Sequence, residues 1–220
     1  NKKKGKNLDK KTKKTGKFLK IFFNQTVKKA IENGIDVIRI FDALNDTRNM
    51  EQAMKSCKKY GGICEAAISY TISPVHNEDY FVELAKKLEK MGADVICIKD
   101  MAGLLVPYKA TELISALKDV TDLPIQLHTH YTSGVASMTY LKAVEAGVDV
   151  IDTAMSPFGL GTSQPATEAT TETTTEATTQ ATTAPTTAPV TEQTISPAKD
   201  SYQTQLENMS LAEKAGQVVI

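Results

Sequence analysis

Two short stretches of the chain combine residue types that could hold a metal ion. They are "CIKDMAG" at Cys97–Gly103 and "LHTHYTSG" at Leu127–Gly134, and each places polar side chains where an apolar, strand-like run ends. In a strand, residues i and i+2 point to the same face, so His128 and His130 should aim two imidazoles at one point. Imidazole is a ligand for zinc and other first-row divalent ions. The pair therefore predicts half of a metal site, with a metal-free cleft lined by two histidines as the alternative.

Lys99 is the third candidate for this point. If its strand neighbours the strand of His128, the two lie about 4.8 Å apart, and the long side chain of the lysine could reach the histidines. The alternative is an ordinary ion pair between Lys99 and Asp42 or Asp152 at the same edge of the sheet. The residues alone leave both readings open.

Composition limits the classes of protein that need considering. The 220 residues carry 26 basic and 26 acidic side chains, but ten lysines and a single acid fall in the first twenty residues. Residues 1–17 are therefore predicted to be a disordered, solvated segment, and we expect no nucleic-acid partner. The three cysteines form no disulfide framework, which favours a cytoplasmic location. No apolar run is long enough for a transmembrane helix.

The elements that position the candidate residues alternate regularly from residue 18 to residue 166. Strands are predicted at Ile35–Phe41, Ile63–Tyr70, Asp94–Lys99, Pro124–His128 and Asp149–Ala154. Helices are predicted at Gln25–Glu32, Thr47–Lys59, Glu78–Met91, Pro107–Val120 and Thr132–Glu145. Three helices are expected to end at the glycines Gly34, Gly92 and Gly147. Strands that are apolar throughout indicate a parallel sheet covered on both faces.

Repeated β-α units of about thirty residues fit an open α/β sheet or a (β/α)8 barrel. No G-x-G-x-x-G turn follows the first strand, so a dinucleotide-binding fold has no support. Polar residues recur at the carboxyl ends of the strands, where barrel enzymes place their chemistry. They include Asp42 and Asn45, our candidates for substrate binding, as well as Lys99, the two histidines and Asp152. We predict a partial TIM barrel, with about five of eight units.

The composition changes sharply after this region. Half of the 28 residues from Thr167 to Thr194 are threonine. Residues 167–199 are therefore predicted to be a disordered, Thr/Pro-rich linker of a kind often found outside the cell. Residues 200–220 begin like a new helix, with Ser210 and Glu213 spaced as in a capping box.

Four motifs together carry a family resemblance: "GIDVIRIFDALND", "ICIKDMAGLL", "LHTHYTSG" and "DVIDTAMSPFGLGTSQPATE". Across about residues 33–168 they resemble the carboxyltransferase domain of biotin-dependent enzymes, such as pyruvate carboxylase, the oxaloacetate decarboxylase alpha subunit and the transcarboxylase 5S subunit. The resemblance implies that Lys99 becomes carboxylated and binds a divalent metal (zinc, manganese or cobalt) together with His128 and His130. It implies that Thr162 carries a proton between biotin and the pyruvate enolate.

The resemblance also implies partners. Pyruvate or oxaloacetate would be the substrate, and a biotin carboxyl carrier domain would bring the biotin. The tripeptide Ala53-Met54-Lys55 echoes a biotin attachment motif, but Ser56 follows it in a predicted helix, so biotin is expected on another domain or subunit. A homo-oligomer is compatible with this picture.

The chain departs from the family at both ends of the matching region. Nothing in Asn1–Phe23 matches the "TLRD"-like first strand that carries an acidic metal ligand and an arginine. The first two β-α units and the last one are missing, so we expect an incomplete and inactive domain. The segment at about residues 206–220 resembles the start of a family 3 glycoside hydrolase. This gives the alternative prediction of a non-catalytic fragment of a secreted glycosidase, with an extracellular C-terminal part.

Overall fold

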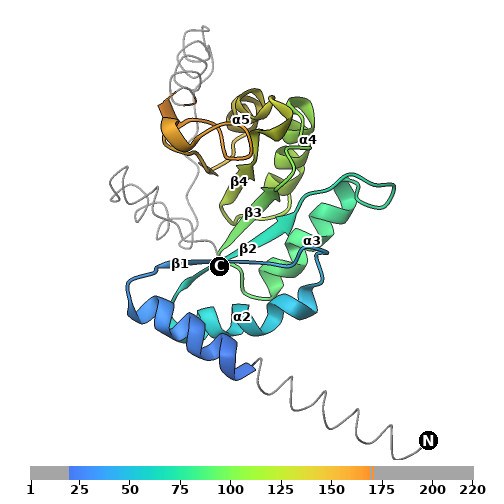
Figure 1. Ribbon diagram of the computed structural model, residues 1–220. Coiled ribbons are helices and arrows are strands. Elements are labelled where there is room, and N and C mark those ends of the chain that lie inside the picture. Colours follow the sequence, from blue (N-terminus) through green and yellow to red (C-terminus); the bar gives the residue numbers. More distant parts are fainter. Residues whose placement is uncertain (1–19, 169, 171–220) are drawn as a thin grey trace, which may run out of the picture.

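The computed structural model describes residues 20–168 and 170, which form a curved parallel sheet with helices along its outer side (Figure 1). Within these residues the sheet has five strands in chain order, β1 Val37–Phe41, β2 Ile63–Ser69, β3 Val95–Asp100, β4 Ile125–Thr129 and β5 Val150–Ile151. The strands alternate with the helices α2 Thr47–Tyr60, α3 Glu78–Lys90, α4 Pro107–Lys118 and α5 Ala136–Glu145. A helix over residues 20–32 precedes β1. The predicted α/β fold, a partial TIM barrel, is confirmed.

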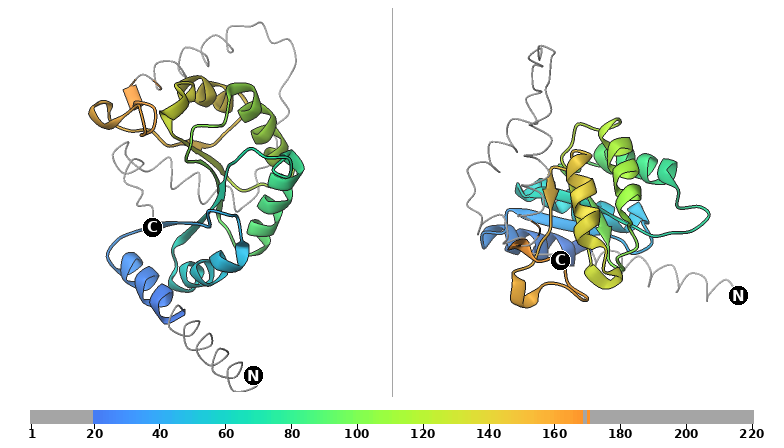
Figure 2. Two further views of the ribbon diagram at one scale, coloured as in Figure 1. Left: turned by 45° about the vertical axis from the view of Figure 1, so that its right-hand side comes forward. Right: turned by 90° about the horizontal axis from the view of Figure 1, so that it is seen from above.

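The two faces of the sheet differ in kind, because successive residues of a strand point to opposite sides. The outer face supplies the apolar core under the helices, through Ile38, Ile40, Ala66, Ile68, Ile96, Ile98, Ile125 and Leu127. The inner face carries buried polar side chains, namely Arg39, Glu65, Lys99, Gln126 and His128. Figure 2 shows the helices as an arc around the outer side, which leaves the inner face for a site. Fully burying one Ile or Leu side chain contributes roughly 1.5–3 kcal/mol, so the outer face holds the sheet together.

Left-handed glycines end the helices where the sequence predicts. Gly34, Gly92 and Gly147 have φ angles of 91°, 98° and 87°. The helix predicted over Thr132–Glu145 is interrupted, which corrects the prediction. A 3-10 turn, η1 Tyr131–Ser133, ends at Gly134 with φ 78°, and α5 begins only at Ala136. This break holds the segment after His130 close to the carboxyl end of β4.

Only the first residues of the predicted linker, 167, 168 and 170, belong to the described part of the chain. Residues 167, 168 and 170 are helical. The Thr167 backbone N–H donates to the Ala154 carbonyl at 2.9 Å, and the Thr170 side chain is buried. The basic segment 1–17, the rest of the Thr-rich linker and the segment 200–220 lie outside the described residues. Among the residues that are described, no helix has both the length and the hydropathy that a membrane crossing requires.

Tyr140 on α5 ties β4 to the segment that leaves β5. Its hydroxyl donates to the Asp152 carbonyl and accepts from the Thr129 backbone N–H at 3.2 Å. The Tyr140 side chain is fully buried, so water cannot replace the hydroxyl if it is removed.

We therefore expect Tyr140→Phe to lower the free energy of unfolding by about 1–3 kcal/mol, since it leaves two buried backbone groups without this partner. The control is Tyr108→Phe, at a side chain that is 75% exposed. That change should stay within about 0.5 kcal/mol. Denaturant unfolding of both variants checks the prediction, and equal losses would contradict it.

Candidate metal centre

His128 and His130 converge as the i, i+2 spacing predicts. Their Nε2 atoms lie 3.1 Å apart, at the carboxyl end of β4. The Nδ1 atom of His128 lies 2.7 Å from Oδ2 of Asp152, and the Nδ1 atom of His130 lies 2.6 Å from the backbone carbonyl of Thr162. A carbonyl or an ionised carboxylate can only accept, so both Nδ1 atoms carry the proton. In this tautomer each ring directs an Nε2 lone pair at the same point.

Two lone pairs that face each other at this distance fit a cation between them. Metal–nitrogen bonds of about 2.0–2.1 Å to both atoms, with the observed separation of 3.1 Å, give an N–metal–N angle of about 100°. This angle suits tetrahedral and octahedral ions alike. Anchoring of the distal Nδ1–H by a carboxylate or a carbonyl is the usual support of a metal-binding histidine. The pair therefore fits a divalent metal.

Lys99 lies beside the histidines on the inner face. It is the register partner of His128 in the β3–β4 pairing, and only 6% of the residue is exposed. Its Nζ lies 5.0 Å from the centre of the Phe41 ring, and no described carboxylate forms an ion pair with it. Burial, together with the charge of Arg39, lowers the pKa of the Lys99 amine. The ion pair with Asp42 or Asp152, our alternative reading, is absent from the described part of the chain.

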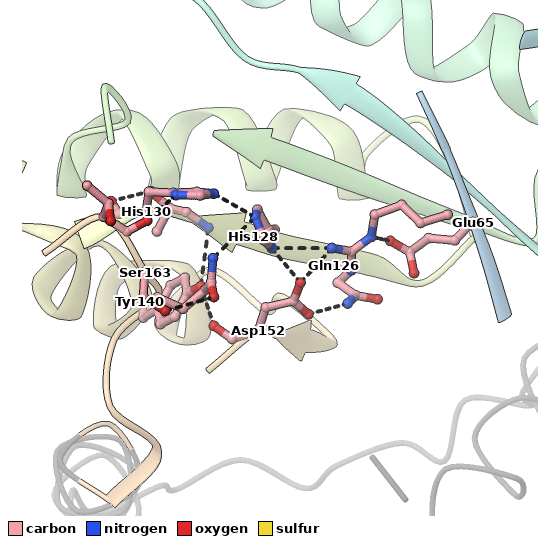
Figure 3. A network of polar contacts seen from close by, with 11 residues as sticks. Glu65, Gln126, His128, His130, Tyr140, Asp152 and Ser163 are labelled. Atoms are coloured by element: carbon pink, nitrogen blue, oxygen red, sulfur yellow. Dashed lines mark hydrogen bonds and ion pairs between the residues drawn. The ribbon is translucent and has the colours of Figure 1, made fainter. Parts of the chain in front are cut away.

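A buried network of charged groups lies behind His128 (Figure 3). Arg39 on β1 is paired through Nε with Glu65 on β2, and its Nη1 donates to Oδ2 of Asp152 at 2.7 Å. The side chain of Gln126 donates to the other oxygen of Asp152. Burial raises the pKa of Asp152, but the hydrogen bond from His128 and the charge of Arg39 outweigh it and lower the pKa to about 2. Asp152 is therefore a permanent carboxylate at neutral pH.

At two neighbours of Asp152, the effect of burial on the pKa outweighs the effect of the surrounding charges. It raises the pKa of Glu65, where the charge of Arg39 opposes the shift only in part. It lowers the pKa of His128, against the opposing effect of Asp152. A neutral imidazole is the form that binds metal, so this shift favours a ligand role at neutral pH.

The loop after β5 forms the other wall of the site. It returns to η1 through the Tyr131 backbone N–H, which donates to the Ser163 carbonyl at 2.7 Å. The amide of Gln164 lies 3.4 Å from Nε2 of His128. The residue Thr162 is exposed, and it reaches His130 through its backbone carbonyl rather than its hydroxyl. The structure therefore brings the backbone of Thr162 to His130, and the catalytic role of the Thr162 hydroxyl stays a prediction.

The backbone geometry at the glycine of "KDMAG" favours a residue without a side chain. Gly103 has φ 65°, and a Cβ there would lie 2.7 Å from the backbone oxygen of His130. The preceding acid, Asp100, turns away from the inner face and accepts from the Leu104 and Leu105 backbone N–H groups. The loop after β3 thus packs directly on the backbone of a predicted ligand.

The structure gives Asp42 and Asn45 other partners. The Asp42 carboxylate accepts from the backbone N–H groups of Leu44 and Asp46 at the start of α2. The Asn45 amide pairs with both backbone groups of Ser69, at 2.8 and 2.9 Å. Both side chains thus hold the β1–α2 loop, and their role in substrate binding stays a prediction.

Four residues around His128 were not singled out as site residues from the sequence: Arg39, Glu65, Gln126 and Tyr140. A signal was available, since "VIRIF" and "ICEAA" each place one charged residue in an otherwise apolar strand. Opposite charges at matching positions of neighbouring buried strands indicate an internal ion pair. Within residues 20–168 and 170, no three His, Cys, Asp or Glu side chains group closely enough to hold a metal. A complete site therefore needs Lys99 or a further group.

A model of the HMGL-like family matches residues 11–199. A pyruvate carboxylase subunit of Methanocaldococcus jannaschii is 64% identical over 141 residues, which are 64% of this chain and 25% of the relative. The methylmalonyl-CoA carboxyltransferase 5S subunit of Propionibacterium freudenreichii subsp. shermanii is 50% identical over 145 residues, 65% of this chain and 29% of the relative. The chain thus spans about a quarter of the length of these relatives.

A solved structure of a similar protein also resembles this chain in its fold. The carboxyl transferase domain from Rhizobium etli pyruvate carboxylase with pyruvate and biocytin matches with a TM-score of 0.68 at 44% identity, over 70% of this chain and 27% of that one. The glycosidase resemblance of residues 206–220 lies outside both the described residues and the matched range, and these comparisons give it no support.

The close approach of Gly103 to the His130 backbone yields a test of how much this packing contributes to stability. Gly103→Ala combines a left-handed backbone, which costs a residue with a Cβ about 1–2 kcal/mol, with a clash against the His130 oxygen. Gly134→Ala is the control, because Gly134 has φ 78° and open space around its Cβ position. We expect Gly103→Ala to lose about 1–3 kcal/mol more of the free energy of unfolding than the control. Equal losses in denaturant unfolding would show that the contact has no weight.

Proposed function

This chain belongs to the HMGL-like family, and we propose that it forms part of a carboxyltransferase domain that moves a carboxyl group between biotin and pyruvate or oxaloacetate. The observation that carries the proposal is the convergence of the His128 and His130 Nε2 atoms beside Lys99. The names of the relatives and the pyruvate and biocytin of the solved structure support the choice of substrates.

His128 and His130 would hold a divalent metal, zinc, manganese or cobalt, with Lys99 as the third ligand. When bound, such an ion supplies Lewis-acid polarisation of the keto acid's carbonyl group, which favours the enolate. The two Nδ1 anchors keep the imidazoles in the orientation that this role needs.

Lys99 becomes a ligand by reacting with CO2. The neutral amine attacks the carbon of CO2, forms a C–N bond and releases one proton, so that a cation is replaced by an anionic carbamate. Burial and the charge of Arg39 lower the pKa of this amine, which increases the neutral fraction that can react. The absence of a paired carboxylate within the described residues leaves the amine available.

Arg39 offers a place for the substrate's carboxylate. Its Nη2 is buried, with 2% of the residue exposed, and it finds no hydrogen-bond partner among the described residues. A buried guanidinium N–H that lacks a partner is costly, and a carboxylate is its best acceptor. We assign Arg39 to holding the keto acid at the inner face, next to the histidine pair.

Thr162 is assigned the proton transfer. A hydroxyl can pass a proton between biotin and the methylene carbon of the enolate without carrying a charge itself. The biotin would arrive on a carrier domain or on another subunit. We place the reaction in the cytoplasm, and we do not propose an extracellular location for the C-terminal part.

By itself the chain is expected to bind metal weakly and to be inactive. The described residues supply two imidazoles and one lysine, the carboxylate of Asp152 contacts Nδ1 of His128 rather than the metal point, and no three described His, Cys, Asp or Glu side chains group closely enough to hold a metal. An ion held by so few ligands would exchange readily and would be lost on dialysis against metal-free buffer.

We expect weak, substoichiometric binding of zinc, manganese or cobalt, and we expect His128→Ala combined with His130→Ala to abolish it. Elemental analysis after equilibrium dialysis measures the bound metal. His76→Ala is the matched control, because His76 bonds to Ser73 in a separate loop. Metal that survives the double substitution, or that is lost with His76→Ala alone, would contradict the site.

We also expect no oxaloacetate decarboxylation, and no carboxyl transfer from free biotin, above background for the isolated chain. A coupled assay for pyruvate, with and without added cobalt and bicarbonate, measures the rate. Turnover that disappears in Lys99→Ala and Thr162→Ala would refute this expectation and would mean that the chain completes the site by itself.

A further inference from the structure

The two nitrogens of His128 face very different surroundings. Nδ1 lies 2.7 Å from Oδ2 of Asp152, and Nε2 lies 3.1 Å from Nε2 of His130. Nη1 of Arg39 lies 3.2 Å from the same Nδ1 atom. A carboxylate beside Nδ1 requires a proton on that nitrogen, whereas a guanidinium beside it requires a lone pair there. The neighbours of His128 thus favour opposite tautomers.

The distances decide between them. Asp152 is closer to Nδ1 than Arg39 is, and Arg39 Nη1 lies 2.7 Å from the same Oδ2 atom. The guanidinium and the imidazole therefore both donate to one carboxylate oxygen, and the contact between Arg39 and the ring is a by-product of that shared acceptor. We propose that Asp152 is the positioning residue that fixes His128 in the Nδ1–H tautomer and turns its Nε2 lone pair toward the metal point.

The carboxylate can do this because it is itself immobilised. The second carboxylate oxygen of Asp152 accepts from the side chain of Gln126 on β4. The backbone carbonyl of Asp152 accepts from the Tyr140 hydroxyl on α5. Arg39 is paired with Glu65 on β2, which holds the guanidinium in place. The hydrogen bonds of Asp152 thus reach β1, β4 and α5, and its position is set by the fold before any ligand arrives.

Loss of the charge at Asp152 has a definite consequence. When Asp152 no longer carries a carboxylate, the nearest charged neighbour of the His128 Nδ1 atom is the Arg39 guanidinium, which can only donate. His128 should then move its proton to Nε2 and lose the lone pair that a metal needs. His130 should keep its Nδ1–H tautomer, since the Thr162 carbonyl that fixes it is untouched.

The inference deepens the proposed function, because the metal is the reason for the tautomer, but its first test needs no metal. Long-range 1H–15N spectra of the chelator-treated chain at pH 8 report the tautomer of each neutral histidine. Single substitutions assign the signals of the three histidines. We expect Nδ1–H at His128 in the native sequence and a shift toward Nε2–H in Asp152→Asn. An Nε2–H signal for His128 in the native sequence overturns the proposal, whether or not any variant folds.

The second test uses zinc chloride in calorimetric titrations. Asp152→Asn should weaken zinc binding by about 10–100-fold, the usual effect of removing a partner that orients a ligand. Asp149→Asn is the matched control, because it removes the same charge near the same strand while contacting Lys118 and the Ile125 backbone instead. It should leave both the tautomer and the zinc affinity unchanged. An unchanged tautomer in Asp152→Asn, or an equal loss in Asp149→Asn, would refute the role. No zinc binding by the native chain, with the Nδ1–H tautomer intact, would instead count against the proposed function alone.

Discussion

The partly buried carboxylate of Asp152 is the constraint on which the rest of this site depends. It lies between two donors of different kind, the guanidinium of Arg39 and the imidazole of His128, and it satisfies both through one oxygen atom. A lone carboxylate in this position would be strongly disfavoured by burial, and so would a lone guanidinium. The two are stable only together, and Glu65 balances the remaining positive charge. The inner face of the sheet is thus organised by charge, as its outer face is organised by apolar packing.

The division into an apolar outer face and a charged inner face lets one sheet provide both a stable core and the functional side chains. Alternation along each strand places isoleucines and alanines against the helices and charged residues on the opposite side. The register of the strands then places Lys99 beside His128 and Arg39 beside Glu65, and no loop is needed to bring these pairs together. The loops add finer adjustments, such as the glycine that lets the β3–α4 loop touch the His130 backbone. The carboxyl ends of the strands are where TIM barrels in general place their active sites.

Much of this could be predicted from the sequence, for clear physical reasons. Apolar strand runs, helix-ending glycines and the His-x-His spacing are local signals, and the structure follows them, except that the strand predicted over Asp149–Ala154 is shortened to Val150–Ile151. The break before α5 was missed because Gly134 was placed inside a helical pattern rather than at its start. The contacts of Asp42 and Asn45 could not be predicted from the sequence. A polar residue at the end of a strand can stabilise a loop or bind a ligand, depending on the direction of its side chain. The internal ion pair needed the register of two strands, which no single stretch contains.

The contact between His130 and the loop after β5 bears on which changes this region can absorb over evolutionary time. The contact uses the backbone carbonyl of Thr162, and every amino acid has one. Exchanging the side chain at this position therefore alters its chemistry while the orientation of the neighbouring imidazole is inherited unchanged. Adding or deleting a residue nearby would do the reverse, because it would move the carbonyl whatever side chain it carried. The proton transfer that we propose for the Thr162 side chain and the anchoring of His130 by the Thr162 backbone therefore respond to different kinds of genetic change, and each can be selected without the other.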